Sequence, residues 1–346
     1  MRQDRGREFG PNARVTSMND MNTMPDNSPV SRRGVLAGGA AAAALAATRP
    51  GWAQTEGTGS PAVVLVTGTS SGFGRLMAET FARSKLRVIA TMRDVAGRNA
   101  SAAAELRGIA SRERLPIDIV EIDVTKPETV ERGVAQALQL ARRIDVLVNN
   151  AAIAVPGPVE LLPIGTFDAV HETNVNGSLR MFRALAPGMR ERGQGYLIQV
   201  SSALGRFVIP GQGAYCSSKA AVEAAMDAIA AENAAFGIDV TVVQPAGPYP
   251  TRIQANGLRY FEEMLASLSE NEKPRVAAFA AQLAAVRGKF VADERLNPQE
   301  IVEGVLRLVA MRHGTRPRRL AIGPSREAAE SINQAHDRVQ AMIASR

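Results

Sequence analysis

The sequence predicts a doubly wound α/β fold, in which a seven-stranded parallel sheet carries helices on both faces. Seven short runs of apolar and β-branched residues recur along the chain after residue 61. Most of these runs lack polar alternation, as expected for strands that are covered on both faces. The segments between them are long enough for the crossover helices that parallel strands require. No internal repeat is visible, so 61–346 is predicted to form one domain.

Composition supports a globular protein. The chain has 346 residues, of which 45% are hydrophobic and 22% are charged, whereas a disordered chain would be poor in apolar residues. Cys216 is its single cysteine and it has three histidines. An intrachain disulfide is therefore excluded and no metal site is predicted.

The positive net charge of the chain suggests a second function, the binding of nucleic acid by a basic protein. The formal net charge is +7, but aromatic residues make up only 4% of the chain and none of them interleave with a cationic cluster. Stacking platforms beside basic residues are typical of nucleic-acid binding. The sequence therefore disfavours a nucleic-acid partner, and no stable membrane insertion is expected because no apolar run reaches the roughly 20 residues of a spanning helix.

The first sixty residues differ from the rest. Residues 1–30 are polar and unpatterned and are predicted to be a disordered extension. Residues 31–53 contain the pair Arg32 and Arg33, a small apolar run over 35–47 and a small-residue end at Ala53, which together resemble a twin-arginine signal peptide. Residues 54–60 would form a linker. The chain is expected to be periplasmic or exported, or cytoplasmic if this segment is an unused Ala-rich extension.

The elements of the domain follow in order. The expected strands are 62–67, 86–92, 117–122, 144–149, 195–201, 238–244 and 319–323, and the helical segments between them include 75–84, 128–143, 167–192 and 217–236. A long, mostly helical insertion at about 251–297 separates the last two strands. Its apolar residues form either a simple core or, as we favour, a mobile substrate lid; they are Tyr249, Tyr260, Phe261, Met264, Leu265 and Leu268.

A glycine-rich turn joins the first strand to the first helix. Gly68, Gly72 and Gly74 lie in it, with Ser70, Ser71 and Phe73 between them. Residues without a Cβ let the backbone approach a pyrophosphate, and the helix N-terminus supplies donors and positive potential. The spacing differs from the usual Gly-x-Gly-x-x-Gly, but its place in the first βα unit favours nucleotide binding.

A second motif follows the fifth strand. Ser202 comes directly after it, and Tyr215 and Lys219 lie four residues apart in the next helix, on one face. A nearby ammonium favours a phenolate, so the pKa of Tyr215 is expected to fall toward the range of a general acid or base. The alternative is an exposed surface pair. The chain uses few lysines, which favours a specific role for Lys219.

Together these residues resemble the short-chain dehydrogenase/reductase family, in its single-domain branch with a Tyr-x-x-x-Lys motif. The resemblance covers 61 to about 323. The matching motifs occur in order: the turn from Thr67 to Gly74, Asp123-Val124, Asn149-Asn150-Ala151-Ala152, Asn174, Ser202, Tyr215 and Lys219. It implies a Rossmann-type fold with a helical substrate lid.

The resemblance also implies catalytic roles. Tyr215 would act as general acid or base on the substrate oxygen and Ser202 would hydrogen-bond that oxygen. Lys219 would lower the pKa of Tyr215 and bind the nicotinamide ribose, while Asn174 would hold a water of the proton relay. The implied function is an oxidoreductase that transfers a hydride between nicotinamide and the carbinol or carbonyl carbon of an alcohol, ketone or aldehyde. The alternative is a catalytically idle NAD(P)-binding sensor or scaffold.

Two positions depart from the family pattern. Ala152 replaces the usual glycine, which matters only if that position needs a positive φ or a very close neighbour. After the sixth strand, the expected Pro-Gly pair is separated into Pro245 and Gly247, and Thr251 keeps the spacing of the threonine that contacts the nicotinamide.

The end of the second strand favours NADP(H) as the cofactor, with NAD(H) still open. NAD-binding proteins place a carboxylate there for the ribose hydroxyls; this chain has Arg93 ahead of Asp94, and an arginine at this place commonly binds the 2′-phosphate in the family. The expected cofactor-binding residues are Gly68, Ser70, Ser71, Gly72, Phe73, Gly74, Arg93, Asp123, Val124, Asn150, Ala151, Tyr215, Lys219, Pro245, Gly247 and Thr251. The expected partners are an alcohol or carbonyl substrate and further copies of the chain, as a dimer or tetramer.

Overall fold

The computed structural model of the protein describes residues 62–344. The predicted extension 1–30, signal peptide 31–53 and linker 54–60 lie outside these residues and stay predictions.

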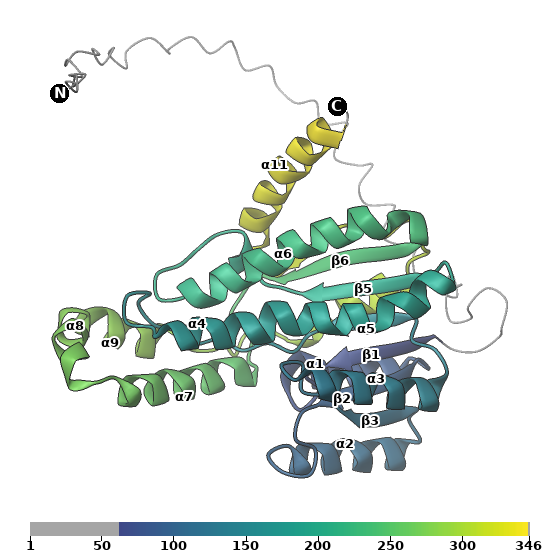
Figure 1. The fold of residues 1–346 in the computed structure, drawn as a ribbon, viewed down its shortest axis with the longest axis horizontal. Helices are drawn as coiled ribbons and strands as arrows, with labels where there is room; N and C mark the ends of the chain where they lie inside the picture. The colour runs from purple at the N-terminus through teal and green to yellow at the C-terminus, as the bar shows by residue number, and fades with distance from the viewer. Residues whose placement is uncertain (1–61, 345–346) are drawn as a thin grey trace, which may run out of the picture. The chain divides into compact units, whose positions relative to one another are not determined.

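The seven predicted strands form one sheet (Figure 1). They are β1 (Val63–Thr67), β2 (Arg87–Met92), β3 (Ile117–Glu121), β4 (Val146–Asn149), β5 (Gly195–Val200), β6 (Ile238–Pro245) and β7 (Arg319–Ile322). Every neighbouring pair is parallel, in the order β3-β2-β1-β4-β5-β6-β7. The predicted fold class is confirmed, and each predicted strand lies within two residues of an observed one.

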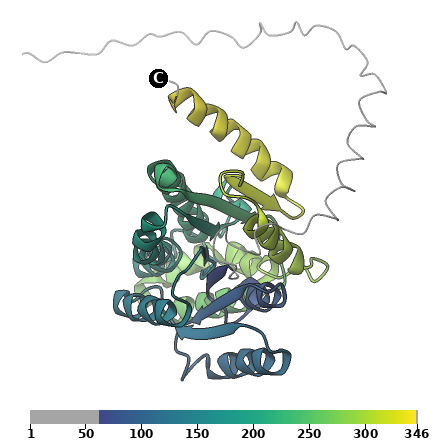
Figure 2. The same ribbon diagram turned by 90° about the vertical axis from the view of Figure 1, so that its right-hand side faces the viewer.

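Helices cover both faces of the sheet (Figure 2). They are α1 (Gly72–Arg83), α2 (Ala100–Glu113), α3 (Pro127–Ala141), α4 (Ile164–His171), α5 (Gly177–Glu191), α6 (Gly213–Asn233), α7 (Arg252–Ser267), α8 (Lys273–Ala278), α9 (Ala280–Lys289), α10 (Gln299–Ala310) and α11 (Arg326–Ala344). One buried cluster joins the sheet to α1, α2 and α10, and a second joins it to α3, α5 and α6.

The alternation of side chains along β1 explains the two clusters. Val64 and Val66 pack into the first cluster, whereas Val63 and Leu65 pack into the second. Successive side chains of a strand point to opposite faces, so a strand covered on both faces must be apolar throughout. The continuous apolar runs in the sequence have this physical cause.

Three predicted helices differ from the structure. The predicted helix 217–236 begins four residues earlier and ends three earlier, as α6. The first helix begins at Gly72 rather than Arg75, so the glycine turn leads directly into helix. The predicted helix 167–192 is divided by a π-helical turn, Glu172–Asn176, between α4 and α5. π-turns of this kind occur often at functional sites, and this one holds Asn174.

The insertion between β6 and β7 contains α7, α8 and α9, at the left of Figure 1. Phe261 and Met264 of α7 are buried in an apolar cluster with Val170 and Leu283, so the core interpretation describes these two residues. Tyr249 belongs instead to the sheet core, where its ring packs edge-on against Phe73 at 5.6 Å between centroids. Whether the insertion moves as a lid stays a prediction.

The last helix, α11, packs near the loop that follows β5. Small residues, among them Ala203, Ala246, Ala321 and Ala329, are buried together there and let the backbones approach closely. Within 62–344, no helix combines the length and apolar character needed to cross a bilayer, and no cluster of potential metal ligands occurs.

Candidate active site

The site lies where the strand order reverses, between β1 and β4. In open parallel sheets, ligands bind at the carboxyl ends of the strands at such a point. Gly68, in the turn after β1, has φ +72° and approaches the segment after β4 so closely that a Cβ on it would lie 2.9 Å from Ala151 Cα. Gly72, at the start of α1, has φ +57°. Both positions therefore require glycine.

Gly74 has a different role from the other two glycines. A Cβ on it would lie 2.3 Å from Gly68 O and 2.5 Å from Asn150 Nδ2. Asn150 in turn donates from Nδ2 to Thr67 O at 2.8 Å, and its backbone N–H donates to Thr67 Oγ1 at 2.9 Å. Gly74 and Asn150 thus fix the shape of the glycine turn, and Gly74 does not line the pocket beside it.

The N-terminus of α1 is suited to an anion. Its N-cap residue, Ser71, makes no side-chain capping hydrogen bond, and the first turn contains no acidic residue. The amides at the start of a helix point outward and carry positive potential, so they bind phosphate groups well.

A pocket of about 370 Å³ collects most of the predicted residues. Every expected cofactor-binding residue except Gly74 lines it, and so do the three catalytic candidates Ser202, Tyr215 and Lys219; Asn174 does not. Sequence reasoning missed further residues of the same pocket wall; the polar and charged ones among them include Arg98, Asn99, Arg252, Asn256 and Arg259. Asp123 is the acidic residue of this lining. The pocket therefore fits a nucleotide with several phosphates.

Asp94 does not face this pocket. It adopts a positive φ of 50°, and its Oδ2 accepts from the backbone N–H of Arg98 at 2.7 Å. Arg93 and Arg98 both line the pocket, and Asn99 Nδ2 holds the loop by donating to Arg93 O at 2.6 Å. Cations rather than a carboxylate therefore border the pocket at the end of β2.

Two positions that the sequence left open can be described further. Ala152 has no positive φ, so an alanine there causes no strain in its own backbone conformation. Asp123 lines the pocket, and its Oδ1 also accepts from Thr125 N at 3.0 Å as an ordinary turn cap. Its binding of the cofactor stays a prediction.

Tyr215, Ser202 and Lys219 come together as predicted. Ser202 ends the β5 segment, where its Oγ accepts from Leu204 N at 3.1 Å, and its side chain hydrogen-bonds the Tyr215 hydroxyl. Lys219 is 2% exposed; its Nζ lies 5.5 Å from the centroid of the Tyr215 ring and donates to Val200 O at 3.0 Å.

Burial controls the protonation of both groups. It raises the pKa of Tyr215 to about 12, against a hydrogen bond from Ser202 that lowers it. It lowers the pKa of Lys219 to about 8, against the charge of Glu223 that raises it. The expected lowering of the Tyr215 pKa by Lys219 is therefore not found, because desolvation of the phenolate dominates.

Asn174 lies in the π-helical turn and its side-chain amide is committed to protein partners. Its Oδ1 accepts from Ile153 N and its Nδ2 donates to Ile153 O, each at 2.9 Å, while the second Nδ2 proton goes to Ser218 Oγ at 2.9 Å. The amide thus ties the segment after β4 to α6, the helix that carries Tyr215 and Lys219. Its role in holding a water stays a prediction.

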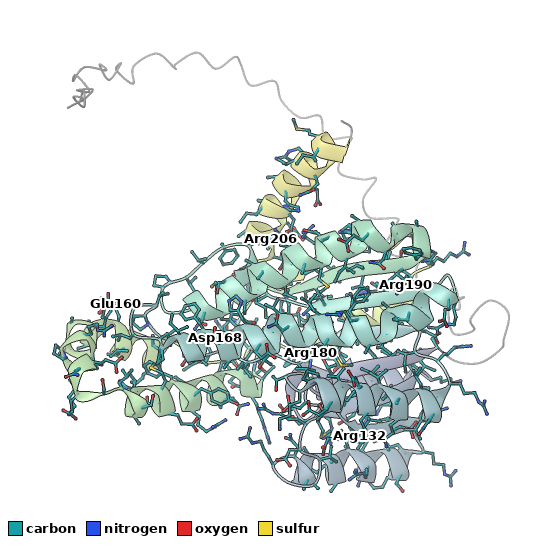
Figure 3. The ribbon with its side chains drawn as sticks, in the orientation of Figure 1. Arg132, Glu160, Asp168, Arg180, Arg190 and Arg206 are labelled. Carbon is teal, nitrogen blue, oxygen red and sulfur yellow. The ribbon has the colours of Figure 1, made fainter. Side chains whose placement is uncertain are left out.

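Sequence reasoning missed a buried carboxylate beneath the site. Glu223, one turn after Lys219, is 1% exposed and accepts from Ser201 Oγ at 2.7 Å. Its charge is opposed by Arg206, whose Nε lies 2.8 Å from Glu223 Oε2 and which is labelled in Figure 3 near the base of α11. Burial raises the pKa of Glu223, although Arg206 lowers it. Nothing in the sequence distinguished Glu223 from a solvent-facing helix residue.

A second cavity, of about 840 Å³, adjoins the first. Its wall is mostly apolar and includes Phe207, Ile209, Phe279, Val286 and Phe290; none of the lining residues whose side chains the structure describes is charged. Ser202 and Tyr215 line both cavities. The hydroxyl groups of the predicted catalytic residues therefore stand where a cationic pocket meets an apolar one.

Comparison with known proteins identifies the family. Residues 62–258 match the family model described as short chain dehydrogenase. The chain is a short-chain dehydrogenase/reductase. This short-chain dehydrogenase/reductase is 29% identical over 262 residues to retinol dehydrogenase 8 of Homo sapiens, covering 75% of this chain and 80% of the relative. It is 32% identical over 253 residues to the uncharacterized oxidoreductase YusZ of Bacillus subtilis (strain 168), covering 72% and 85%.

Solved structures agree with this assignment. A short-chain dehydrogenase from Streptomyces avermitilis is 30% identical, with a TM-score of 0.63 and coverage of 82% of this chain and 96% of that one. An enzyme of the family from Burkholderia phymatum, in complex with NAD, shares the fold at 22% identity and a TM-score of 0.66, covering 81% and 95%. The short-chain dehydrogenase/reductase described here is therefore an oxidoreductase with an NAD(P)-binding Rossmann-type fold.

Proposed function

We propose that this enzyme is an NADP(H)-dependent oxidoreductase that interconverts an alcohol and the corresponding ketone or aldehyde on a large, uncharged and mostly apolar substrate. One observation carries the proposal: the cationic pocket and the apolar cavity meet at Ser202 and Tyr215. A substrate oxygen at this junction would lie beside two hydroxyl groups while the rest of the substrate occupies the apolar cavity.

The residues divide the chemistry between them. The nicotinamide, when bound, supplies or accepts the hydride. Tyr215 gives a proton to the substrate oxygen during reduction and takes one from it during oxidation. Ser202 hydrogen-bonds the same oxygen and so stabilises the charge that develops on it. Lys219 places a cation beside the phenol ring, 5.5 Å from its centroid, and would bind the ribose of the nicotinamide.

Two features of the pocket support NADP(H). Arg93 and Arg98 line it, and Asp94 turns its carboxylate away. The N-terminus of α1, free of capping side chains, suits the pyrophosphate that NAD(H) and NADP(H) share. A 2′-phosphate is favoured by guanidinium groups and repelled by a carboxylate. Titration of the purified protein with NADPH and NADH tests this; tighter binding of NADH would contradict it.

The substrate class is supported by the wall of the second cavity. A volume of about 840 Å³, with no charge among the described side chains that line it, favours an extended hydrocarbon body over a sugar or an amino acid. Human retinol dehydrogenase 8, a relative of this chain, is named for such a substrate. A panel of aldehydes, ketones, steroids and secondary alcohols with NADPH or NADP+ would identify it.

A matched pair of variants tests the catalytic assignment. Ser202→Ala and Tyr215→Phe are expected to lose about 10²–10⁴-fold in kcat while nucleotide binding persists. Ser217→Ala is the control, because Ser217 lies on α6 outside both cavities and donates to Ala214 O. Turnover by Tyr215→Phe equal to that of the unaltered protein would reject the assignment, and no turnover on any substrate would favour an idle nucleotide-binding sensor.

We also propose export through the twin-arginine route, on the strength of residues 31–53. This route carries folded proteins, so nucleotide could be loaded before export. Cell fractionation of the unaltered chain and of an Arg32→Lys, Arg33→Lys double variant tests it; the same cytoplasmic share in both would reject export.

A further inference from the structure

Helix α7 of the insertion contacts the loop that follows β2. The two segments are far apart in the sequence. Tyr260 of α7 accepts a hydrogen bond at its hydroxyl from Arg93 Nη2 at 3.4 Å. These residues lie 167 positions apart, and both line the nucleotide pocket. The insertion therefore closes the nucleotide pocket as well as the substrate cavity.

A second cation from α7 joins this contact. The guanidinium of Arg259 lies 4.3 Å from the centroid of the Tyr260 ring, and Arg259 also lines the pocket. Burial raises the pKa of Tyr260, but Arg93 and Arg259 lower it by more, so the net change is downward. The phenol oxygen is thus an electron-rich acceptor placed between two arginines.

The other contact of Arg259 is weak. It pairs with Glu263, one turn further along α7, at 2.5 Å, and both side chains are largely exposed. Exposed pairs of this kind contribute little because water screens them. Arg259 is therefore free to exchange this carboxylate for a phosphate, to which guanidinium groups bind in a bidentate manner.

We propose that Arg259 and Tyr260 of α7 complete, with Arg93 and Arg98, the site for the phosphate on the adenosine ribose of NADP(H). This inference rests on the proposed function and adds residues of the insertion to the recognition of the cofactor. Arg93 and Arg98 reach this phosphate from the end of β2, and Arg259 reaches it from α7. Tyr260 orients Arg93 by accepting its hydrogen bond.

The arrangement couples the cofactor to the substrate cavity. Ile253 and Gln254, in the first turn of α7, line both cavities, and Phe261 anchors the helix in the apolar cluster. A phosphate that binds Arg259 therefore also holds the helix that borders the substrate. Coupling of this kind is reciprocal, so substrate should bind more tightly in the presence of NADP(H) than of NAD(H).

Binding of cofactor fragments tests the phosphate site without turnover. Calorimetric titration of the purified protein with adenosine 2′,5′-bisphosphate and with adenosine 5′-monophosphate isolates the contribution of the 2′-phosphate. The unaltered protein is expected to prefer the bisphosphate. Arg259→Gln should weaken the binding of the bisphosphate about ten-fold, the effect of losing one charge-assisted hydrogen bond. The affinity for the monophosphate should not change.

The matched control is Arg287→Gln. Arg287 of α9 also pairs with a glutamate of α7, Glu262, at 2.7 Å, but it does not line the nucleotide pocket. The Arg287→Gln substitution therefore loosens the insertion without changing the nucleotide pocket. The affinities for the bisphosphate and for the monophosphate should both stay unchanged. Hydrogen exchange in 252–267 adds a second readout: the bisphosphate should slow it, the monophosphate should not, and Arg259→Gln should abolish the difference.

Contrary results separate this inference from the proposed function. Turnover with NADPH together with an unchanged bisphosphate affinity in Arg259→Gln would overturn the inference alone. An equal loss in Arg259→Gln and Arg287→Gln, or an equal loss for both fragments, would also overturn it, since either points to a loosened insertion. If the unaltered protein binds no nucleotide at all, the proposed function and the inference fall together.

Discussion

Lys219 and Glu223 lie one turn apart on α6, and both are almost completely buried. Lys219 Nζ donates to Val200 O at 3.0 Å on the pocket side, whereas Glu223 pairs with Arg206 and Ser201 beneath it. The carboxylate raises the pKa of the lysine against the desolvation that lowers it. Helix α6 thus holds a cation toward the pocket and a compensating anion behind it.

Lys219→Met should stabilise the fold while abolishing activity. Burial lowers the pKa of Lys219 from 10.5 to about 8, which corresponds to about 3 kcal/mol against folding at neutral pH. The substitution removes this cost, but it also removes the hydrogen bond from Lys219 to Val200 O, which reduces the gain in stability. Gln199 Nε2 still donates to Val200 O at 3.3 Å. A net gain of about 2 kcal/mol is expected in urea unfolding at pH 7. The exposed Lys126→Met should change stability by less than about 0.5 kcal/mol.

The sign of the pH dependence follows from the same group. Between pH 8 and 10.5, Lys219 carries a proton in the unfolded chain but not in the folded protein. The unfolded state then binds more protons, so this contribution to stability rises with pH across that window. The advantage of Lys219→Met should therefore be greatest at pH 7 and should shrink by pH 10. An advantage that is constant with pH would contradict the lowered pKa.

Glu223→Gln should act on both stability and the pH profile. Removal of one partner of a buried ion pair leaves Arg206 uncompensated and is expected to cost about 3 kcal/mol. The loss of its charge should also lower the pKa of Lys219 below 8. Because Lys219 lies beside Tyr215, we expect its titration to give a step near pH 8 in the kcat/KM profile, and this step should move to lower pH in the variant. This readout distinguishes a positioning residue from a merely structural one. The exposed Glu232→Gln on the same helix should alter neither; an unmoved profile in Glu223→Gln would reject the positioning role.

The sheet could be predicted from the sequence because its cause is local. Strands covered on both faces are apolar along most of their length, and in the printed sequence β1 and β4 are apolar up to their last residues, Thr67 and Asn149. The glycine turn could be predicted for a similar reason, since Gly68 and Gly72 take backbone conformations that few other residues adopt.

The features of the site that could not be predicted from the sequence depend on contacts between residues that are far apart in the chain. The hydrogen bond between Arg93 and Tyr260 spans 167 positions, and no local pattern indicates it. Glu223 reads as an exposed helix residue until α6 is packed on the sheet. The direction of the Tyr215 pKa was misjudged for the same reason, because the desolvation of its hydroxyl is a property of the packed structure.

Gly74→Ala should disturb the nucleotide site from outside it. The added methyl group would lie 2.3 Å from Gly68 O, a backbone atom that cannot rotate away. Overpacking of this kind costs about 1–3 kcal/mol, and the shifted turn should also weaken NADPH binding in fluorescence titrations. Gly165→Ala in α4 is the control, since no atom lies within 4 Å of the position that the added Cβ would take. Alanine also favours a helix over glycine by about 1 kcal/mol. Equal stability in the two variants would contradict the close contact.

Val286→Trp should make the enzyme select smaller substrates. Val286 lines the apolar cavity from α9, so a larger side chain there reduces the space for the substrate body without touching Ser202 or Tyr215. The expected result is a fall in kcat/KM for long-chain or polycyclic ketones of about 10-fold or more, with short-chain ketones little affected, because about 1–3 kcal/mol is at stake for each misfitted group. Val208→Trp is the control: Val208 is 78% exposed and lies outside the cavity lining. A uniform fall across substrate sizes would indicate a distorted catalytic site, and no change for any ketone would place the substrate elsewhere.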